Sequence, residues 1–265
     1  MATFDAANFV CSKMFDLTGK KALVVGGHGG IGRAIAEAFA VYGADVSIAS
    51  RSMEKLIEAK EYIKNKYDKD VTVYTVDASS EESIKALYDQ IIADKGQIDI
   101  LANSQGLNLK NHITETQFAD MDKMYKVNVL GIAMLIKYFG KQMKENGYGK
   151  IINVSSTRGS RACLGGNASY CATKGALDML TRTTACDLGP EVRVNAIGPT
   201  NTVTPMMEKL IEEHPEILHL GDDKPLQRIG VPEDCMGPAV FLASKASDFM
   251  TGQIIYADGG MTAIG

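Results

Sequence analysis

"VGGHGGIGRAIAEAFA", residues Val25–Ala40, places five glycines within eight residues, directly after an apolar run and directly before a helical pattern. Glycine loses more backbone entropy on folding than other residues, so such a cluster indicates a structural or functional requirement at this place. Gly26, Gly30 and Gly32 fall between the expected strand and helix with the spacing G-x-x-x-G-x-G. A turn of this kind lets the backbone approach a phosphate at a helix N-terminus, which attracts anions. The alternative is an ordinary tight turn that binds nothing.

Short β-branched runs and longer helical patterns alternate along the whole chain. The expected strands are 20–26, 44–50, 70–77, 98–104, 149–156, 191–199 and 253–260. The expected helices are 30–43, 53–67, 80–96, about 117–146, 170–189 and 232–247. This alternation predicts an α/β fold with a doubly wound, Rossmann-like parallel sheet and helices on both faces. Ligands of such sheets bind at the carboxyl ends of the strands.

Composition narrows the classes of function. Lysines and arginines number 28 and acidic residues 32, so the net charge of −4 offers no electrostatic basis for binding nucleic acid or an anionic membrane. No apolar run is long enough for a signal peptide or a membrane span. The cysteines lack metal-ligand spacing, which predicts no metal site and reduced, mostly buried thiols in a cytoplasmic protein. They are Cys11, Cys163, Cys171, Cys186 and Cys235. Residues 1–13 are expected to form an arm, and 14–265 a single domain.

A tyrosine and a lysine in "YCATK" are candidates for acid/base chemistry. Lys174 follows Tyr170 by four residues, so both side chains project from one face of the expected helix. A nearby ammonium group favours the phenolate and would lower the tyrosine pKa towards neutral pH, where the group can move a proton. Ser155 and Ser156 end the preceding strand, and the Ser156 hydroxyl can donate a hydrogen bond to the reacting oxygen. Taken alone, such a pair on a helix is more often solvated, and such serines more often cap a turn.

The order and spacing of these motifs resemble the short-chain dehydrogenase/reductase family from Phe15 onward. "YCATK" matches its Y-x-x-x-K motif, "ANSQG" its N-N-A-G motif, "NAIGPTNTVTPM" its N-A-x-x-P-G-x-x-x-T motif, and "YADGG" its D-G-G tail. The resemblance implies that Asn128, Ser156, Tyr170 and Lys174 are catalytic, with Asn128 holding a water that passes protons to the lysine. Val25 stands where the family usually has threonine, and the gap from Ser156 to Tyr170 is one residue longer than usual.

The resemblance also implies a nicotinamide dinucleotide cofactor. The implied cofactor residues are Gly26, His28, Gly30, Ile31, Gly32, Ser50, Arg51, Asp77, Ala78, Asn103, Gly106, Tyr170, Lys174, Pro199, Thr202 and Thr204. An acidic residue at the end of the second strand would bind the ribose 2′-hydroxyl, whereas this chain has Ser50 and Arg51, which suit a 2′-phosphate. We therefore expect NADP(H), with NAD(H) as the alternative if Arg51 faces solvent or stacks on adenine. His28 either contacts the 2′-phosphate or lies in a surface turn.

The resemblance implies an oxidoreductase that transfers a hydride between NADP(H) and a secondary alcohol or ketone, and the expected substrate is a polyol, a sugar or a sugar acid. The residues near the expected pocket are polar, which suits a hydroxylated or anionic substrate. They are Asn108, Lys110, His112, Thr157 and Arg158. The "STRG" stretch is similar to sugar and sugar-acid dehydrogenases of the family, including gluconate 5-dehydrogenases, and the resemblance places a substrate loop at about 205–226 and implies a homotetramer. Two alternatives are a 3-oxoacyl-acyl-carrier-protein reductase, which needs a basic surface such as Arg158 with Arg161, and a non-catalytic NADP sensor or scaffold.

Overall fold

A seven-stranded parallel sheet forms the centre of the molecule, as seen in a computed structural model that describes residues 11–203, 211 and 213–264. The strands are β1 Lys21–Val25, β2 Asp45–Ser50, β3 Val71–Thr75, β4 Ile100–Asn103, β5 Gly149–Val154, β6 Val192–Pro199 and β7 Ile254–Ala257. Their order is β3-β2-β1-β4-β5-β6-β7. The order reverses between β1 and β4, which is where ligands of such sheets bind. The predicted doubly wound α/β fold is confirmed.

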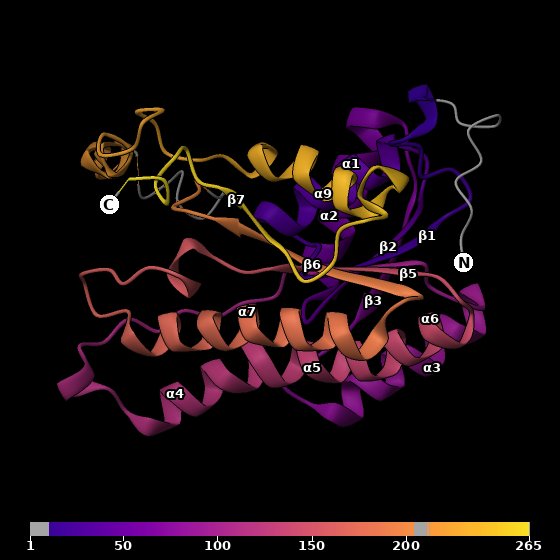
Figure 1. Ribbon diagram of the computed structural model, residues 1–265, viewed down its shortest axis with the longest axis horizontal. Coiled ribbons are helices and arrows are strands. Elements are labelled where there is room, and N and C mark those ends of the chain that lie inside the picture. The colour runs from indigo at the N-terminus through magenta and orange to yellow at the C-terminus, as the bar shows by residue number, and fades with distance from the viewer. Residues whose placement is uncertain (1–10, 204–210, 212, 265) are drawn as a thin grey trace.

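Helices cover both faces of the sheet (Figure 1). On one face lie α1 Gly30–Val41, α2 Met53–Tyr67 and α9 Met236–Ala243, and on the other lie α3 Glu81–Lys95, the α4–α6 segment and α7 Ala168–Leu188. Successive strand residues point to opposite faces, so Val24 joins the core under α1 whereas Leu23 and Val25 join the core under α7. Burial on both faces explains why the strands are continuously apolar.

The long predicted helix 117–146 is interrupted. It consists of α4 Phe118–Tyr125, α5 Gly131–Leu135 and α6 Lys141–Glu145, joined by the π-helical turns Lys126–Leu130 and Ile136–Gly140. The predicted helix 232–247 is shorter than expected, because the 3₁₀ turns Pro232–Cys235 and Lys245–Ser247 flank α9. Pro238 lies in the first turn of α9, where a missing N–H costs little.

The predicted start and end of helix α3 are confirmed. The Ser80 hydroxyl accepts a hydrogen bond from the Ser83 amide at 3.1 Å and caps α3, and Gly96 follows the helix with φ +80°. At the N-terminus, Cys11–Lys13 form a 3₁₀ turn, whereas residues 1–10 of the predicted arm lie outside the described residues. No helix in the described part of the chain combines the length and apolar character needed to cross a membrane.

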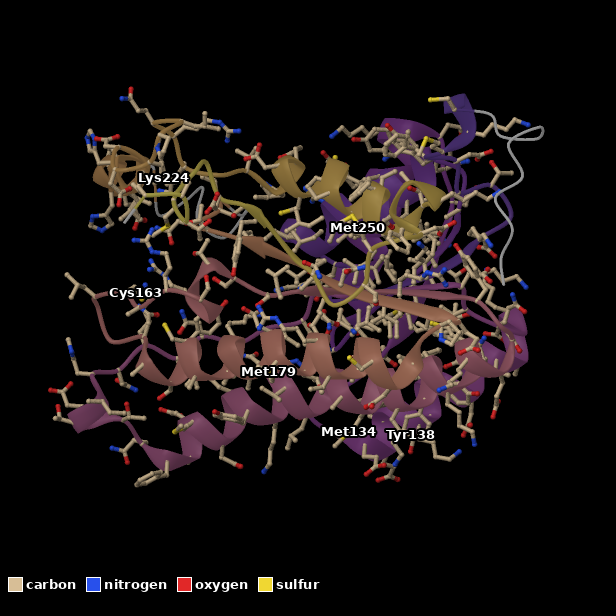
Figure 2. The ribbon with its side chains drawn as sticks, in the orientation of Figure 1. Met134, Tyr138, Cys163, Met179, Lys224 and Met250 are labelled. Carbon is tan, nitrogen blue, oxygen red and sulfur yellow. The ribbon has the colours of Figure 1, made fainter. Side chains whose placement is uncertain are left out.

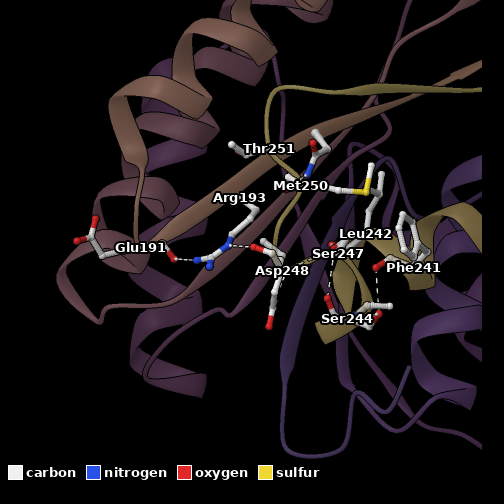
Figure 3. Close-up of polar contacts among 12 residues, drawn as sticks. Glu191, Arg193, Phe241, Leu242, Ser244, Ser247, Asp248, Met250 and Thr251 are labelled. Carbon is white, nitrogen blue, oxygen red and sulfur yellow. Dashed lines mark hydrogen bonds and ion pairs between the residues drawn. The ribbon is translucent and has the colours of Figure 1, made fainter. Parts of the chain in front are cut away.

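The segment between α9 and β7 is attached to the amino ends of β5 and β6, and Figure 3 shows the contact with Arg193 of β6. Arg193 on β6 donates to the Asp248 carbonyl at 2.9 Å and to the Glu191 carbonyl at 3.2 Å. The fully buried Lys150 on β5 donates to the Asp248 carboxylate at 2.8 Å. These contacts hold the segment between α9 and β7 at the sheet edge opposite the carboxyl ends of the strands.

The thiols are free, as predicted, but the prediction that most are buried is wrong. Only Cys235 is buried, Cys163 and Cys171 are half-buried, and Cys11 and Cys186 are exposed. Cys11 lies in the turn Cys11–Lys13 and Cys186 lies in α7, and both side chains are exposed among the residues that the structure describes.

Candidate active site

The glycine turn between β1 and α1 packs tightly against the loop that follows β4. Gly26 has φ +84°, and a Cβ atom there would lie 2.7 Å from the Gln105 amide nitrogen. A methyl group at Gly32 would collide with the Gly26 carbonyl oxygen. Around Gly29 there is open space, and no side chain caps the N-terminus of α1. The first amides of α1 are therefore available to an anion.

Positive charge gathers where β2 ends, beside this turn. Burial together with the charges of Lys55 and Arg51 lowers the pKa of His28. The His28 Nδ1 atom is buried without a hydrogen-bond partner. Arg51 is exposed and forms no ion pair with any described residue, and the Ser50 hydroxyl makes only a long 3.5 Å contact with the Ser52 carbonyl. These groups fit the predicted 2′-phosphate, which would be a partner for the unpaired His28 nitrogen and for Arg51.

Asp77 and Ala78 lie in the turn after β3. Asp77 accepts hydrogen bonds from the Ser79 amide and hydroxyl at 2.9 and 2.7 Å, which lower its pKa, as does the more distant charge of Arg51. The Ala78 carbonyl faces Gly131 so closely that any side chain at Gly131 would collide with it. The turn therefore packs against the start of α5, with the Asp77 side chain exposed.

The Asn103 side chain does not face the open site. It is fully buried, and its amide donates to the Asn153 oxygen at 2.9 Å, while Asn153 donates to the Thr181 hydroxyl at 3.0 Å. This chain of polar contacts runs beneath the carboxyl ends of β4 and β5. The Asn103 side-chain oxygen is buried without a hydrogen-bond partner among the described residues.

Tyr170 and Lys174 lie on one face of α7, as the spacing predicts. The Lys174 Nζ atom donates to the Val154 carbonyl at 2.8 Å and lies 5.7 Å from the centre of the Tyr170 ring. Lys174 is 3% exposed, and burial lowers its pKa to about 8, although Asp178 pulls it upwards. The Lys174 ammonium group therefore lies close to the Tyr170 ring, and it loses its proton at a lower pH than an exposed lysine does.

The predicted lowering of the Tyr170 pKa is wrong for this arrangement. Burial raises the Tyr170 pKa to about 12, and the Ser156 hydroxyl and the Arg158 charge offset only part of that rise. The Lys174 ammonium contributes nothing that reverses it, because it is directed at the Val154 carbonyl. At neutral pH Tyr170 therefore keeps its proton and is a proton donor.

The two serines after β5 have different partners. Ser155 donates to the carboxylate of Asp178, which is itself 3% exposed and whose pKa is raised by burial. Ser156 accepts from the Arg158 amide at 3.2 Å, and its hydroxyl lies beside Tyr170, where it lowers the pKa of the phenol. The sequence reasoning missed Asp178, although the signal was present: it follows Lys174 by four residues and so lies on the same face of α7.

Asn128 lies in the first π-helical turn and clamps the loop after β4. Its oxygen accepts from the Leu107 amide at 2.8 Å, and its amide group donates to the Leu107 carbonyl at 2.8 Å and to the Thr173 hydroxyl at 3.1 Å. Both amide protons are used, so the side chain cannot donate to the predicted relay water. A Cβ atom at Gly106 would lie 3.9 Å from both the Asn128 oxygen and the Lys174 nitrogen, so Asn128 sets the position of Gly106 over the lysine.

Two loops meet on the substrate side. The Asn111 amide donates to the Gly166 carbonyl at 2.9 Å, and the Asn108 side chain donates to the Asn167 oxygen at 3.1 Å. The longer Ser156–Tyr170 gap is therefore used to reach the loop after β4. Lys110 and His112 are exposed in that loop.

Arg158 and Arg161 do not form the joint basic surface that an acidic carrier protein would need. Arg161 is directed at the C-terminal segment, where it donates to the Met261 carbonyl and, at 2.6 Å, to the Ile264 carbonyl. Arg158 forms no ion pair with any residue that the structure describes, and its charge acts on both Tyr170 and Cys171.

The loop after β6 supplies the remaining predicted residues. Pro199 ends β6, and the Thr202 hydroxyl donates to the Thr200 carbonyl at 2.9 Å. Thr204 lies outside the described residues, as do 205–210 and 212 of the predicted substrate loop, whereas Pro215–Gly221 form a 3₁₀ helix. Within the described ranges, no group of three or more His, Cys, Asp or Glu side chains is arranged to hold a metal ion.

Comparisons with known proteins agree with this geometry. Residues 25–262 match a family model described as enoyl-(acyl carrier protein) reductase. Gluconate 5-dehydrogenase of Gluconobacter oxydans is 34% identical, with 94% of this chain and 97% of that protein covered. A 3-oxoacyl-[acyl-carrier-protein] reductase of Aquifex aeolicus is also 34% identical, with 92% and 98% covered. The crystal structure of a gluconate 5-dehydrogenase from Burkholderia cenocepacia in complex with NADP and tartrate has a TM-score of 0.88 and 30% identity, with 96% and 99% covered.

Proposed function

The chain belongs to the short-chain dehydrogenase/reductase family of oxidoreductases, and on this basis we propose that it transfers a hydride between NADP(H) and a hydroxylated carboxylic acid. The substrate class is a sugar acid, with polyols and neutral sugars as poorer substrates. The observation that carries the substrate class is Arg158, a guanidinium beside the proton donor Tyr170 that forms no ion pair with any residue the structure describes. An unpaired arginine suits a carboxylate, which it can bind with two parallel hydrogen bonds.

The chain's own residues supply the proton and the binding of the reacting oxygen. The nicotinamide cofactor, when bound, provides or accepts the hydride. Tyr170 holds a proton at neutral pH, because its pKa is about 12, and gives it to the carbonyl oxygen during reduction. Ser156 donates a second hydrogen bond to that oxygen, which favours the charge developing on it. Asn128 holds Gly106 and the loop after β4 in place over Lys174.

The groups around the glycine turn support NADP(H) as the cofactor. The uncapped N-terminus of α1 offers amides to the pyrophosphate, and the unpaired His28 nitrogen, Ser50 and Arg51 offer partners to the 2′-phosphate. The related Burkholderia cenocepacia enzyme was crystallised with NADP. NAD(H) is the alternative, and it would require Arg51 to contribute nothing to binding.

Relatives support the sugar-acid class in a second way. Besides the Gluconobacter oxydans enzyme, 5-keto-D-gluconate 5-reductase of Escherichia coli has a sequence 32% identical to this chain. The tartrate in the Burkholderia cenocepacia structure is itself a hydroxylated acid. A carboxylate on the substrate would give Arg158 an ion-pair partner, which none of the described residues provides.

Reduction of a 3-oxoacyl group on acyl carrier protein is the second candidate, since a reductase of that kind matches nearly the whole chain. Acyl carrier proteins are acidic, and the attachment of Arg161 to the C-terminal segment leaves Arg158 without a second arginine to extend a basic surface. A non-catalytic sensor or scaffold would not need a protonated Tyr170 beside a free Ser156 hydroxyl. Turnover of any substrate excludes that alternative.

A fluorescence titration with NADPH and NADH, followed by reduction assays, tests the proposal. We expect Arg51→Gln to weaken NADPH binding about tenfold or more and to leave NADH binding unchanged, because a charge-assisted contact is lost. Arg158→Gln should raise KM for 5-keto-D-gluconate about tenfold and leave the KM of a neutral keto-sugar unchanged. Arg182→Gln, which changes an exposed arginine on α7, is the control. Equal NADPH and NADH affinity, or faster reduction of an acetoacetyl carrier protein than of keto acids, would contradict the proposal.

We also propose that the enzyme is a cytoplasmic homotetramer. Leu130 and Met179 are 47% and 55% exposed on the long helices of one face, where Met134 also lies (Figure 2). Apolar side chains on neighbouring helices are suited to packing against a second copy. Light scattering on the purified protein measures the assembly, and a monomeric mass would contradict it.

A further inference from the structure

Two cysteine thiols meet beside Tyr170. The Sγ atoms of Cys163 and Cys171 are 3.9 Å apart and in contact. Cys171 directly follows Tyr170 in the first turns of α7, and Cys163 lies eight residues earlier in the loop that leads into this helix (Figure 2). Both side chains are half-buried, so each can be reached by a small molecule in solution.

We propose that Cys163 and Cys171 are a redox modification site, which forms a reversible disulfide on reaction with a peroxide and thereby lowers turnover. This inference rests on the proposed function, because the site that it regulates is the reductase site around Tyr170. Reversible disulfides in reducing compartments are usually transient and act as sensors. The pair is not used by the hydride and proton transfer steps.

The local backbone permits the bond. A disulfide needs a sulfur–sulfur distance of about 2.05 Å, so the two atoms must approach by about 1.9 Å. Between the 3₁₀ turn Thr157–Gly159 and the start of α7, the chain has no helical or strand hydrogen bonds to break. The loop can therefore move towards α7 without breaking a helix or a strand, although the movement displaces the Gly166 carbonyl that accepts from the Asn111 amide.

One molecule of hydrogen peroxide is enough to oxidise the two thiols to a disulfide. The thiolate of one cysteine attacks the peroxide oxygen, forms a sulfenic acid and releases water. The second thiol then displaces the hydroxyl group, forms the S–S bond and releases a second water, so two electrons leave the sulfurs and reduce one hydrogen peroxide. Burial raises the pKa of the Cys171 thiol, while Arg158 pulls it down. Because Cys163 lies in the loop whereas Cys171 is held in the first turns of α7, we assign the first oxidation to Cys163 and the second step to Cys171.

The bond would alter the substrate side of the site. Arg158 lies in the 3₁₀ turn directly before the loop that carries Cys163, and the Gly166 carbonyl of this loop accepts from the Asn111 amide of the facing loop. Drawing this loop onto α7 shifts the proposed carboxylate-binding arginine relative to Tyr170. The glycine turn and Arg51 belong to other loops, so NADPH binding should not change.

The test compares the wild type with Cys163→Ser, Cys171→Ser and a control, Cys186→Ser, whose exposed thiol lies near the other end of α7. Each reduced protein is treated with hydrogen peroxide, the free thiols are alkylated, and peptides are mapped by mass spectrometry. In the wild type and the control we expect a Cys163–Cys171 cross-link and a fall in kcat/KM for 5-keto-D-gluconate of about tenfold or more, restored by dithiothreitol. The other two variants should keep their basal turnover and lose the response to peroxide.

Either of two results would overturn the inference: both thiols remain open to alkylation after peroxide, or the cross-link forms and turnover and KM stay unchanged. Failure of the proposed function looks different. In that case the fully reduced wild type would not reduce keto acids with NADPH, while the peptide map would still decide whether the disulfide forms.

Discussion

Replacing Lys174 by methionine should stabilise the ligand-free protein at neutral pH while abolishing its activity. Lys174 is 3% exposed, and burial lowers its pKa from 10.5 to about 8. At 1.36 kcal/mol per pKa unit, this difference means that the charged amine costs the folded state about 3.4 kcal/mol. The hydrogen bond to the Val154 carbonyl, which the variant loses, is worth about 1 kcal/mol. The net gain in unfolding free energy at pH 7 is therefore about 2 kcal/mol for Lys174→Met.

The gain should disappear at high pH. Because the folded pKa of Lys174 is below its unfolded value, the unfolded chain binds more protons between pH 8 and 10.5, and the stability of the wild type rises through that window. The methionine variant has no such rise. The difference between the two proteins should therefore fall to about zero near pH 10, where the remaining charge penalty is about equal to the lost hydrogen bond. Titrating groups other than Asp178, whose pKa Lys174 lowers, affect both proteins alike.

Urea denaturation at pH 7 and at about pH 10 measures both values. Lys144→Met is the matched control, because Lys144 also donates to a backbone carbonyl, that of Asp187, but is exposed. Its unfolding free energy should change by less than about 0.5 kcal/mol and equally at both pH values. A Lys174→Met variant that is less stable at pH 7, or a difference that stays constant from pH 7 to 10, would refute the reasoning.

Three further variants test the site. Tyr170→Phe should reduce turnover by about 10³-fold, because the proton donor is lost. The NADPH affinity in the fluorescence titration should stay unchanged. Turnover within tenfold of the wild type would mean that another group gives the proton. Ser155→Ala should lower the unfolding free energy by about 1–3 kcal/mol, because the buried Asp178 loses its donor; an unchanged urea midpoint would show that the contact contributes nothing. Gly32→Ala should abolish NADPH binding with little change in circular dichroism, because the methyl group collides with Gly26; binding at wild-type strength would remove the glycine turn from the site.

The secondary structure and the local turns were predictable because they depend on residues that lie close together in the chain. The alternation of strands and helices, the Ser80 cap of α3 and the glycine turn all follow from residues within a few positions of one another. Tyr170 and Lys174 share a face of α7 for the same reason, since four residues make about one helical turn. The family motifs could then be recognised from their order along the chain.

The interruptions of the long helix could not be read from its apolar pattern, because a π-helical turn changes the phase by one residue without changing the composition. One such turn contains Asn128, whose partner is the backbone of Leu107 in a distant loop. Arg161 was expected at a surface patch, but the C-terminal segment folds back to meet it. These contacts join residues far apart in the chain, and only the packed fold brings them together.

By itself, the sequence determined the sheet, the glycine turn and the shared face of Tyr170 and Lys174, because each depends on residues only a few positions apart in the chain. Tertiary structure alone decided the protonation of the site and the contact between Cys163 and Cys171. Burial sets the Tyr170 pKa at about 12 and the Lys174 pKa at about 8, the reverse of what the charges alone suggested for the tyrosine. Desolvation depends on every element packed around a group, and that packing has no short-range signature in the chain.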